Sequence, residues 1–297
     1  MKLLVFGAGG QVGTELGRAK LPPGMTLAAF DQADLDITDP AVIRAAIHRE
    51  RPDLVVNAAA YTAVDRAESE AEAAFAVNAQ APGDIAAACA EAGIRLVHIS
   101  TDYVYDGAKP GPYVEGDPIN PLGVYGRSKA AGDAAVAAAL AEHVILRTAW
   151  VYSAHGGNFV KTMLRLASER PSLRVVADQH GSPTAAADIA AAIITIAARI
   201  GAGEGRWGVF HFTGAGATTW HGFAEAIVGL AGKNVPVAAI ATADYPTPAR
   251  RPANSVLDCA KIAGAYGIAA RPWREALAEV VAELFDKSAQ ADQTRPT

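Results

Sequence analysis

Short apolar runs alternate with longer helical patterns along the first half of the chain. The apolar runs cover residues 2–6, 26–30, 53–56, 94–99 and 144–148, and helical patterns separate them. Runs of this length and composition suit strands that are buried on both faces. Strands that alternate with helices and have right-handed crossovers form a doubly wound sheet. The pattern therefore predicts an α/β fold with a central parallel sheet.

The pattern becomes less regular beyond residue 150. It predicts a strand at 173–176 and another at 209–212, and the second of these is expected to return to the sheet. Helices are predicted to begin at Thr219 and to run from Pro272 to about Lys287. These elements indicate a smaller second lobe after the sheet.

A glycine-rich loop follows the first predicted strand directly. Its sequence is Gly7-Ala-Gly-Gly-Gln-Val-Gly13, and it opens a helical pattern. Glycines at 7, 10 and 13 let the backbone turn tightly and approach a pyrophosphate, which rests on the N–H groups that open the helix. The alternative is a plain tight turn. The position between a strand and a helix favours the nucleotide-binding interpretation.

Asp31 ends the second predicted strand, about 20 residues after the loop, where an acid is expected to bind the adenosine ribose. A carboxylate there repels the additional phosphate of NADP, so the residues favour NADH. Asp34 and Asp36 leave open which acid faces the ribose. The alternative is a solvated aspartate at a strand end.

These signals divide the chain into two functional parts. A Rossmann-type dinucleotide-binding domain is expected in residues 1–150, and residues 181–213 are expected to return to it. Residues 151–180 and 214–287 then form a smaller substrate-binding lobe. The polar segment 288–297 is expected to be a mobile tail.

Small side chains follow the third predicted strand, in the segment Asn57-Ala-Ala-Ala-Tyr61. They leave room for a flat ligand at the edge where open parallel sheets bind ligands. The alternative is that the alanines only pack against a helix. Asn78, in the next helical region, is a candidate for a buried hydrogen-bonding group.

Four acids follow this segment: Asp65, Glu68, Glu70 and Glu72. Their spacing on a predicted helix indicates a solvated face, and no tight metal-ligand spacing is evident among them. We therefore expect these side chains to be exposed to water.

Thr101, Tyr125 and Lys129 bring a hydroxyl, a phenol and an amine to the end of the fourth predicted strand. Positions i and i+4 are neighbours on a helix, so Tyr125 and Lys129 can share one cleft. A free tyrosine titrates near ~10, and a nearby cation lowers that pKa. Such a phenol can donate a proton to a carbonyl oxygen while a hydride reaches the carbon, and Thr101 can bind the same oxygen.

Aromatic and cationic residues of the second half suggest ligand contacts. Trp150, at a strand end, and Asn158 can hold a planar base or a sugar; the alternative is a tryptophan that packs under a lid. Arg250 and Arg251, with Ser255 nearby, offer a cationic site suited to a diphosphate. The alternative is a pair of exposed arginines.

Composition narrows the class of protein. The chain has 297 residues, of which 51% are hydrophobic, and a net charge of −5. There is no basic field to attract nucleic acid. Two cysteines cannot form a disulfide framework, and no apolar segment suits a signal peptide or a membrane span. We expect a cytoplasmic protein without a membrane or nucleic-acid partner.

Taken together, the motifs resemble the extended short-chain dehydrogenase/reductase family, and within it the reductases of dTDP-4-dehydrorhamnose. The resemblance covers nearly the whole chain. The matching segments are Gly10 to Gly13, Ala58 to Asp65, Ser100 to Tyr105, Tyr125-x-x-x-Lys129, Arg147 to Tyr152, Asp178 to Thr184 and Arg251-Pro-x-x-Ser255.

The resemblance implies NADPH- or NADH-dependent reduction of the 4-keto group of dTDP-4-dehydro-β-L-rhamnose. It makes Tyr125 the proton donor, Lys129 the group that lowers the pKa of Tyr125 and binds the nicotinamide ribose, and Thr101 the group that orients the carbonyl. The predicted substrate site comprises Val64, Asp102, Tyr103, Trp150, Asn158 and Arg251. The predicted cofactor site comprises Gly7, Gly10, Gln11, Val12, Asp31, Asp36, Ile37, Ala58, Ala59, Ala60, Tyr61, Tyr125 and Lys129.

The family leaves several points open. Some members are associated with Mg²⁺, whose ligands cannot be located in this sequence, and a homodimer is one expected assembly. A related 4,6-dehydratase would have an acidic pair after the threonine, whereas Tyr103 follows Asp102 here. An epimerase/reductase would need a Cys and a His in the sugar pocket, and both cysteines fall outside the motifs. A regulatory subunit without catalysis is the remaining alternative.

Overall fold

A six-stranded parallel sheet forms the centre of the larger part of the molecule. The computed structural model describes residues 1–293, with side chains described through residue 287. The strand order is β10-β5-β4-β3-β1-β2, and every neighbouring pair is parallel. The predicted doubly wound parallel sheet is therefore confirmed. Its strands are β1 Lys2–Phe6, β2 Thr26–Phe30, β3 Leu54–Asn57, β4 Arg95–Thr101, β5 His143–Thr148 and β10 Gly208–His211.

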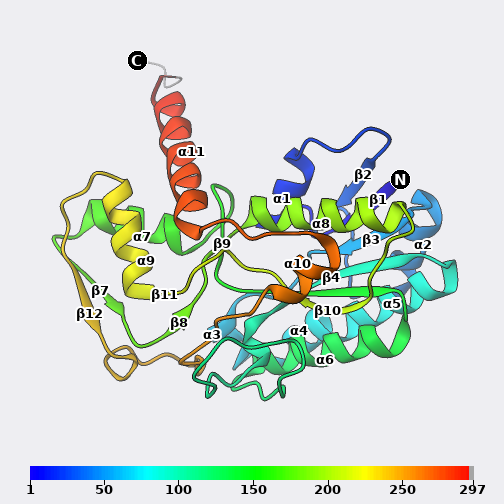
Figure 1. Ribbon diagram of the computed structural model, residues 1–297, viewed down its shortest axis with the longest axis horizontal. Helices are drawn as coiled ribbons and strands as arrows, with labels where there is room; N and C mark the ends of the chain where they lie inside the picture. The colour runs from blue at the N-terminus through cyan, green and yellow to red at the C-terminus, as the bar shows by residue number, and fades with distance from the viewer. Residues whose placement is uncertain (294–297) are drawn as a thin grey trace.

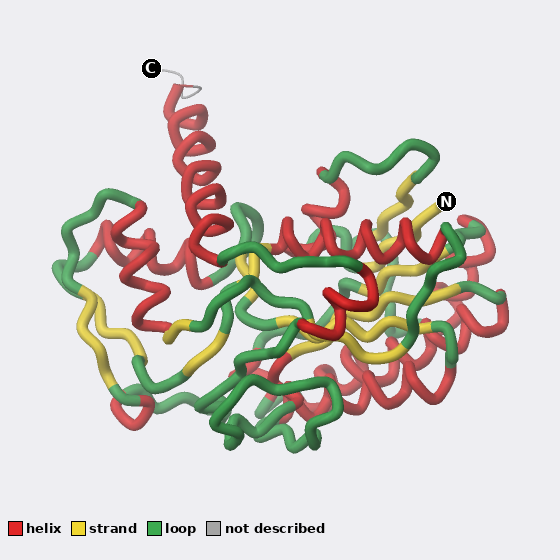
Figure 2. The backbone as a smooth tube through the Cα atoms, in the orientation of Figure 1, coloured by secondary structure: helices red, strands yellow, loops and turns green. Residues whose placement is uncertain are grey.

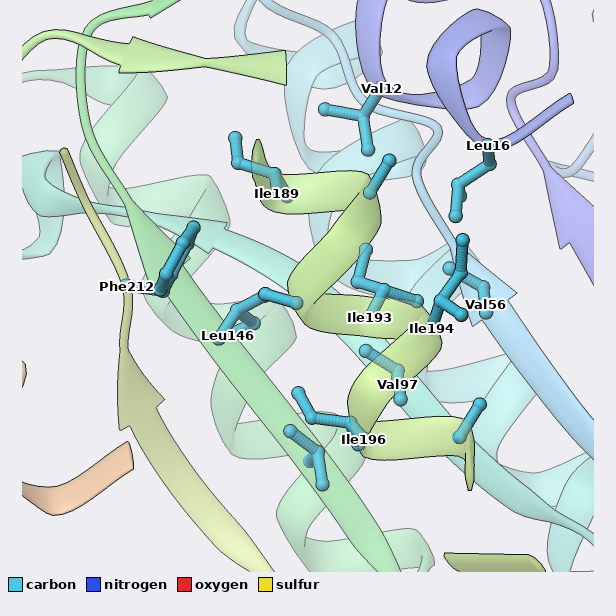
Figure 3. Close-up of a cluster of buried hydrophobic side chains, with 14 of the residues drawn as sticks. Val12, Leu16, Val56, Val97, Leu146, Ile189, Ile193, Ile194, Ile196 and Phe212 are labelled. Atoms are coloured by element: carbon cyan, nitrogen blue, oxygen red, sulfur yellow. The ribbon is translucent and has the colours of Figure 1, made fainter. Parts of the chain in front are cut away.

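Helices cover both faces of this sheet (Figures 1 and 2). On one face, apolar residues of α1 and α8 pack against the strands, as Figure 3 shows for Leu16, Ile193 and Val56. On the other face, Ile43, Ile85 and residues near them form a second buried cluster. The helices are α1 Gln11–Arg18, α2 Pro40–Glu50, α3 Val64–Ala67, α4 Ala71–Phe75, the π-helical turn η1 Ala76–Gln80, α5 Ala81–Ala92, the 3₁₀ turn η2 Asp102–Val104, α6 Val124–Ala139 and α8 Ala186–Gly201.

Local sequence signals set several helix ends. The side chain of Asp39 accepts hydrogen bonds from the N–H groups of Ala41 and Val42, and Pro40 is the first residue of α2. This is the favoured start of a helix, because it satisfies N–H groups that have no partner within the helix. Gly93 ends α5 with a φ of 67°, which glycine adopts without strain.

A second part of the molecule lies beside the sheet, on the left in Figure 1. Its core contains Val160, Phe223, Leu277 and other buried residues from α7, α9 and α11. Strands β7 and β12 form a parallel pair at its outer side. The elements are β6 Val151–Tyr152, α7 Phe159–Glu169, β7 Leu173–Val176, β8 His180–Gly181, β9 Thr184–Ala185, β11 Thr218–Thr219, α9 Trp220–Leu230, β12 Val237–Ile240, the 3₁₀ turn η3 Thr242–Asp244 and α11 Trp273–Gln293. Helix α10 Ala260–Tyr266 lies against the sheet instead, where Ile262 and Tyr266 join the core that contains α8.

Two expectations for the second half have different outcomes. Strand β10 pairs with β5, as predicted for the segment that returns to the sheet. Helix α11, however, continues to Gln293 and does not end near Lys287. Its last residues are mostly Ala and Gln, which favour helix, so the predicted helix end near Lys287 is wrong. The mobile tail predicted from residue 288 stays a prediction for 288–293. The remainder of that tail, 294–297, lies outside the described residues.

No helix in the described part of the chain has the length and apolar character needed to cross a membrane.

Candidate active site

A cleft of about 820 Å³ lies at the carboxyl ends of the sheet strands. Parallel strands place their carboxyl ends on one edge, where ligands of doubly wound sheets bind. The cleft is lined by all the residues predicted for the cofactor and for catalysis, and by five of the six predicted for the substrate. The sixth, Arg251, lines a small second pocket together with Tyr103 and Trp150, which line both.

The glycine loop lies in close contact with the segment that follows β3. Gly7 has a φ of +89°, and a Cβ atom at this position would lie 2.5 Å from the backbone nitrogen of Ala59. A Cβ atom at Gly13 would lie 2.1 Å from the carbonyl oxygen of Gly7. Only glycine fits these two positions, so the loop can form a pyrophosphate cradle at the start of α1.

Asp31 lies at the far end of the cleft and is held by its own loop. Its Oδ1 accepts hydrogen bonds from the N–H groups of Ala33 and Asp34, at 2.8 and 3.2 Å. Asp31 and Asp36 line the cleft, whereas Asp34 is not among the lining residues. Among described lining residues, Lys129 is the only Lys or Arg. This end of the cleft therefore presents carboxylates.

Asn78 connects the segment after β3 to helix α6. Its side chain exchanges two hydrogen bonds with the backbone of Tyr61, and its Nδ2 donates to Ser128 Oγ. The amide is almost completely buried. Asn78 is therefore the buried hydrogen-bonding group that the sequence suggested.

The acids after β3 are exposed or partly exposed to water, as predicted, and three of the four also have hydrogen-bond partners. Glu68 accepts a hydrogen bond from the N–H of Val124 at 2.8 Å, at the start of α6. Glu70 accepts one from the Tyr61 hydroxyl. Asp65 forms a two-pronged ion pair with Arg251. The elements that supply these partners are far apart in sequence, so the spacing of the acids alone gave no sign of them.

Helix α6 is anchored to the sheet by a buried ion pair. Arg147 on β5 donates from Nε to Asp133 Oδ2 at 3.0 Å and from Nη1 to the Tyr105 hydroxyl at 2.8 Å. Both charged side chains are almost fully buried. Breaking such a pair leaves an uncompensated charge, so it fixes the helix that carries Tyr125 and Lys129.

The three predicted catalytic residues meet in the middle of the cleft. Lys129 donates from Nζ to the carbonyl oxygen of Ile99 at 2.7 Å. Thr101 donates from its hydroxyl to Asp102 Oδ1 at 2.9 Å, and all three predicted catalytic residues line the cleft. The ring of Tyr125 meets the ring of Tyr103 edge to face, with centroids 5.4 Å apart. The contact with the Tyr103 ring thus restricts the orientation of the Tyr125 phenol.

Burial governs the protonation of this group. It raises the pKa of Tyr125 to about 12, while the hydroxyl of Thr101 acts in the opposite direction. Burial lowers the pKa of Lys129 to about 8, and Asp133 opposes this shift. The pKa of Tyr125 is therefore raised and not lowered as expected, because the loss of water is the largest influence and Lys129 is not among the groups that shift it.

Asp102 is also buried, and its Oδ2 has no hydrogen-bond partner among the described residues. Burial raises the pKa of this carboxyl to about 6, although the hydroxyl groups of Ser255 and Thr101 favour the charged form. Asp102 lines the cleft, and its contact with a substrate stays a prediction.

Trp150 is held by aromatic stacking, whereas Asn158 is held by hydrogen bonds. Trp150 has a φ of +49°, which is rare for a bulky residue, and its indole stacks on that of Trp220 at 3.6 Å. The side chain of Asn158 accepts from the N–H of Lys161 at the start of α7 and donates to Gln11 at 2.9 Å. Asn158 thus connects the glycine loop to the second lobe.

Arg251 is engaged by a carboxylate in this structure. Its guanidinium donates to both oxygens of Asp65, at 3.1 and 2.8 Å, and to the Thr247 hydroxyl at 2.5 Å. It is neither fully exposed nor unpaired. This bidentate geometry fixes the plane of the guanidinium at the entrance of the small second pocket.

Three residues of this second pocket were given no role by the sequence prediction: Gln179, Trp220 and Pro252. Gln179 and Pro252 belong to motifs that carried the family resemblance, so the signal was present without a role attached to it. Trp220 follows Thr219 at the start of a predicted helix, and nothing in the local pattern distinguished it from a packing residue.

The described residues fit a dinucleotide better than a metal ion. The glycine cradle, the alanines beside it and the acids at the far end match the outline of a nicotinamide dinucleotide. Within the described chain, no three His, Cys, Asp or Glu side chains are grouped so that they could hold a metal ion. The suggested Mg²⁺ site thus gains no support from these side chains.

Comparisons with known proteins show the family of this chain. The family model of the RmlD substrate binding domain matches residues 1–285. A dTDP-4-dehydrorhamnose reductase of Sinorhizobium fredii is 45% identical over 96% of this chain and 98% of its own length. The chain belongs to the dTDP-4-dehydrorhamnose reductase family.

Solved structures of this family have the same fold. A dTDP-4-dehydrorhamnose reductase of Clostridium acetobutylicum superposes with a TM-score of 0.91, at 37% identity over 96% of this chain and 99% of that one. One from Bacillus anthracis, in complex with NADP, has a TM-score of 0.89 at 35% identity over 95% and 99% of the two chains. The similarity to these reductases thus covers both the central Rossmann-type sheet and the second lobe.

The close contact at Gly13 gives a test of the cradle. We expect Gly13→Ala to weaken NADH binding at least tenfold, because the new Cβ atom would overlap backbone atoms of Gly7 and Ala8. Gly17→Ala, in the same helix, is the matched control, since nothing lies within 4 Å of its Cβ position. Titration of nicotinamide fluorescence measures both. Equal affinity in the two variants would contradict the cradle.

Proposed function

We propose that this protein reduces the 4-keto group of dTDP-4-dehydro-β-L-rhamnose to give dTDP-β-L-rhamnose, with NADH or NADPH as the hydride donor. The observation that carries the proposal is the single cleft that joins the glycine cradle to Thr101, Tyr125 and Lys129. The family membership supplies the substrate. One hydride from the reduced cofactor and one proton convert the keto group to a hydroxyl group, and the cofactor leaves in its oxidised form.

The cofactor, when bound along the glycine cradle, supplies a hydride to the carbonyl carbon. Tyr125 then donates its phenolic proton to the carbonyl oxygen. With a pKa of about 12 it remains a phenol at neutral pH, and the oxygen produced by hydride addition is an alkoxide, a stronger base than phenolate. A raised pKa therefore suits a proton donor as well as a lowered one.

Lys129 and Thr101 assist this proton transfer. Lys129, still protonated below a pH of about 8, stabilises the phenolate that remains on Tyr125. Thr101 orients the carbonyl oxygen. The N–H of Tyr103 holds the Thr101 oxygen in place, and the Thr101 hydroxyl, which donates to Asp102 in this structure, turns its proton to the carbonyl oxygen when substrate binds. The positions of these groups are set before the substrate arrives, which is the main protein contribution to such catalysis.

The residues that line the cleft also argue against the alternative reactions of this fold. Among the described residues that line it, none is Cys or His, which an epimerase/reductase would need. Asp102 is followed by Tyr103, so the second acid of a dehydratase is not present there. Simple keto reduction remains the reaction that these residues favour.

The proposal extends to the substrate, the compartment and the assembly. We propose that the protein binds a dTDP-sugar, that it acts in the cytoplasm and that it forms a homodimer. Two cysteines without a disulfide and a nucleotide-linked substrate support the compartment. Mass measurement in solution tests the assembly.

A coupled assay tests the reaction. Purified protein with dTDP-4-dehydro-β-L-rhamnose should oxidise NADH or NADPH, and Tyr125→Phe should lower kcat by about 10²- to 10⁴-fold, because the proton donor is lost. The variant should still bind NADH, with at most a small loss of affinity because the ring of Tyr125 remains, and this binding shows that the cleft is intact. Turnover that survives the substitution would rule out Tyr125 as the donor.

The rate should depend on the protonation of Lys129. Its pKa is lowered from 10.5 to about 8, so the side chain is a cation below that pH and neutral above it. We therefore expect kcat/KM to fall as the pH rises through about 8. A profile that stays flat up to pH 10 would show that the charge of Lys129 is not required.

Cofactor choice tests the role of Asp31. We expect a higher kcat/KM with NADH than with NADPH, because a carboxylate and no lining cation face the site of the second phosphate. Asp31→Ser should shift this ratio toward NADPH by roughly tenfold. Asp34→Ser removes a neighbouring acid that does not line the cleft, and should leave the ratio near its original value. A similar shift in both variants would argue against Asp31.

A further inference from the structure

Trp150 occupies a strained and central position in the site. It follows β5, and its φ of +49° lies in the left-handed region, which costs a bulky residue free energy. Its carbonyl oxygen accepts a hydrogen bond from the N–H of Thr184. A strained backbone persists only where its surroundings determine it, and strained residues are concentrated at functional sites.

One determinant is Gly181, in the segment Asp178 to Thr184, to which the proposed reaction gives no role. A Cβ atom at Gly181 would lie 2.3 Å from Cε2 and 2.5 Å from Nε1 of Trp150. The φ of Gly181 is not in the left-handed region. Glycine is therefore needed here for space, because the indole of Trp150 lies directly against the backbone.

A second determinant is Trp220. Its indole stacks on Trp150 with ring centroids 3.6 Å apart and an angle of 7° between the planes. Trp220 begins α9, directly after β11, and β11 pairs with β8, which contains Gly181. Both determinants thus belong to one small structural unit. Phe159 and Phe223 support Trp220 from the core of the second lobe.

Trp150 stands between the large cleft and the small second pocket. Together with Tyr103 it lines the large cleft and also the small pocket that contains Trp220 and Arg251. An aromatic face at this boundary is suited to the apolar face of a sugar ring or of a base. Its orientation therefore decides the shape of the substrate end of the cleft.

We propose that Gly181 and Trp220 are positioning residues that hold the indole of Trp150 as a fixed wall for the nucleotide-linked sugar. The inference rests on the proposed function, because it assumes that this end of the cleft receives that substrate. Gly181 provides the space, Trp220 provides the stacking partner, and the pairing of β8 with β11 keeps the two in register. Neither residue contacts the reacting groups.

Two substitutions test the positioning. Gly181→Ala should force the indole to move, and Trp220→Leu should remove its stacking partner. Each should raise the KM for the dTDP-sugar by about tenfold, with kcat and the KM for NADH changed little. The circular-dichroism couplet of two stacked indoles should be lost in both variants, which reports the geometry directly.

Matched controls separate positioning from general damage. Gly229→Ala, in α9, adds a methyl group where nothing lies within 4 Å, and should leave KM and the couplet unchanged. Trp220→Phe keeps an aromatic ring against Trp150, and should restore most of the substrate affinity although the couplet is lost. Thermal melting shows whether each variant is folded. If Gly181→Ala does not fold, the pair Trp220→Leu and Trp220→Phe decides.

Binding of dTDP alone, measured by calorimetry, distinguishes a failure of the positioning from a failure of the proposed function. Weaker binding in Trp220→Leu than in Trp220→Phe supports the positioning. Unchanged binding and unchanged KM in both Trp220→Leu and Gly181→Ala, with the couplet lost, overturn the positioning and leave the proposed function intact. A wild-type protein that neither binds dTDP nor turns over the sugar overturns the proposed function and this inference with it.

Discussion

The close approach of two backbone segments at the edge of the sheet determines where ligands can bind. Gly7 and Gly13 leave no room for a Cβ atom, because the backbone of Ala59 on one side and of the glycine loop itself on the other is already in contact. The parallel pairing of β1 with β3 produces this approach. The strands β4 and β5 end on the same edge of the sheet. The residues that follow them therefore line the same cleft as the glycine loop.

Loss of water at this edge explains the unusual chemistry of the site. Tyr125, Lys129 and Asp102 all have pKa values shifted toward the neutral form by burial. The buried pair of Arg147 and Asp133 holds the helix in spite of the cost of desolvation. A site in which charges are disfavoured responds strongly to any charge that forms during a reaction.

The parts of the structure that rest on local pattern could be predicted from the sequence. The strands, the glycine loop and the spacing of Tyr125 and Lys129 are properties of short segments, and the parallel sheet follows from their order. The partners of Asp65 and Trp150 could not be predicted, because Arg251 and Trp220 come from distant segments that tertiary folding brings back. The pKa of Tyr125 was predicted in the wrong direction, because sequence spacing shows a nearby cation but does not show how much water is excluded.

The ion pair between Arg251 and Asp65 has a consequence for how a diphosphate would be recognised. At a distance the two charges nearly cancel, and the chain as a whole carries a net charge of −5. The molecule therefore offers little long-range attraction for an anion, and association is not accelerated by electrostatic steering. The guanidinium becomes attractive only at close range, where its orientation matters more than its charge. Selection among the many anionic nucleotides of a cell would then depend on fit after contact, and little on the rate of encounter.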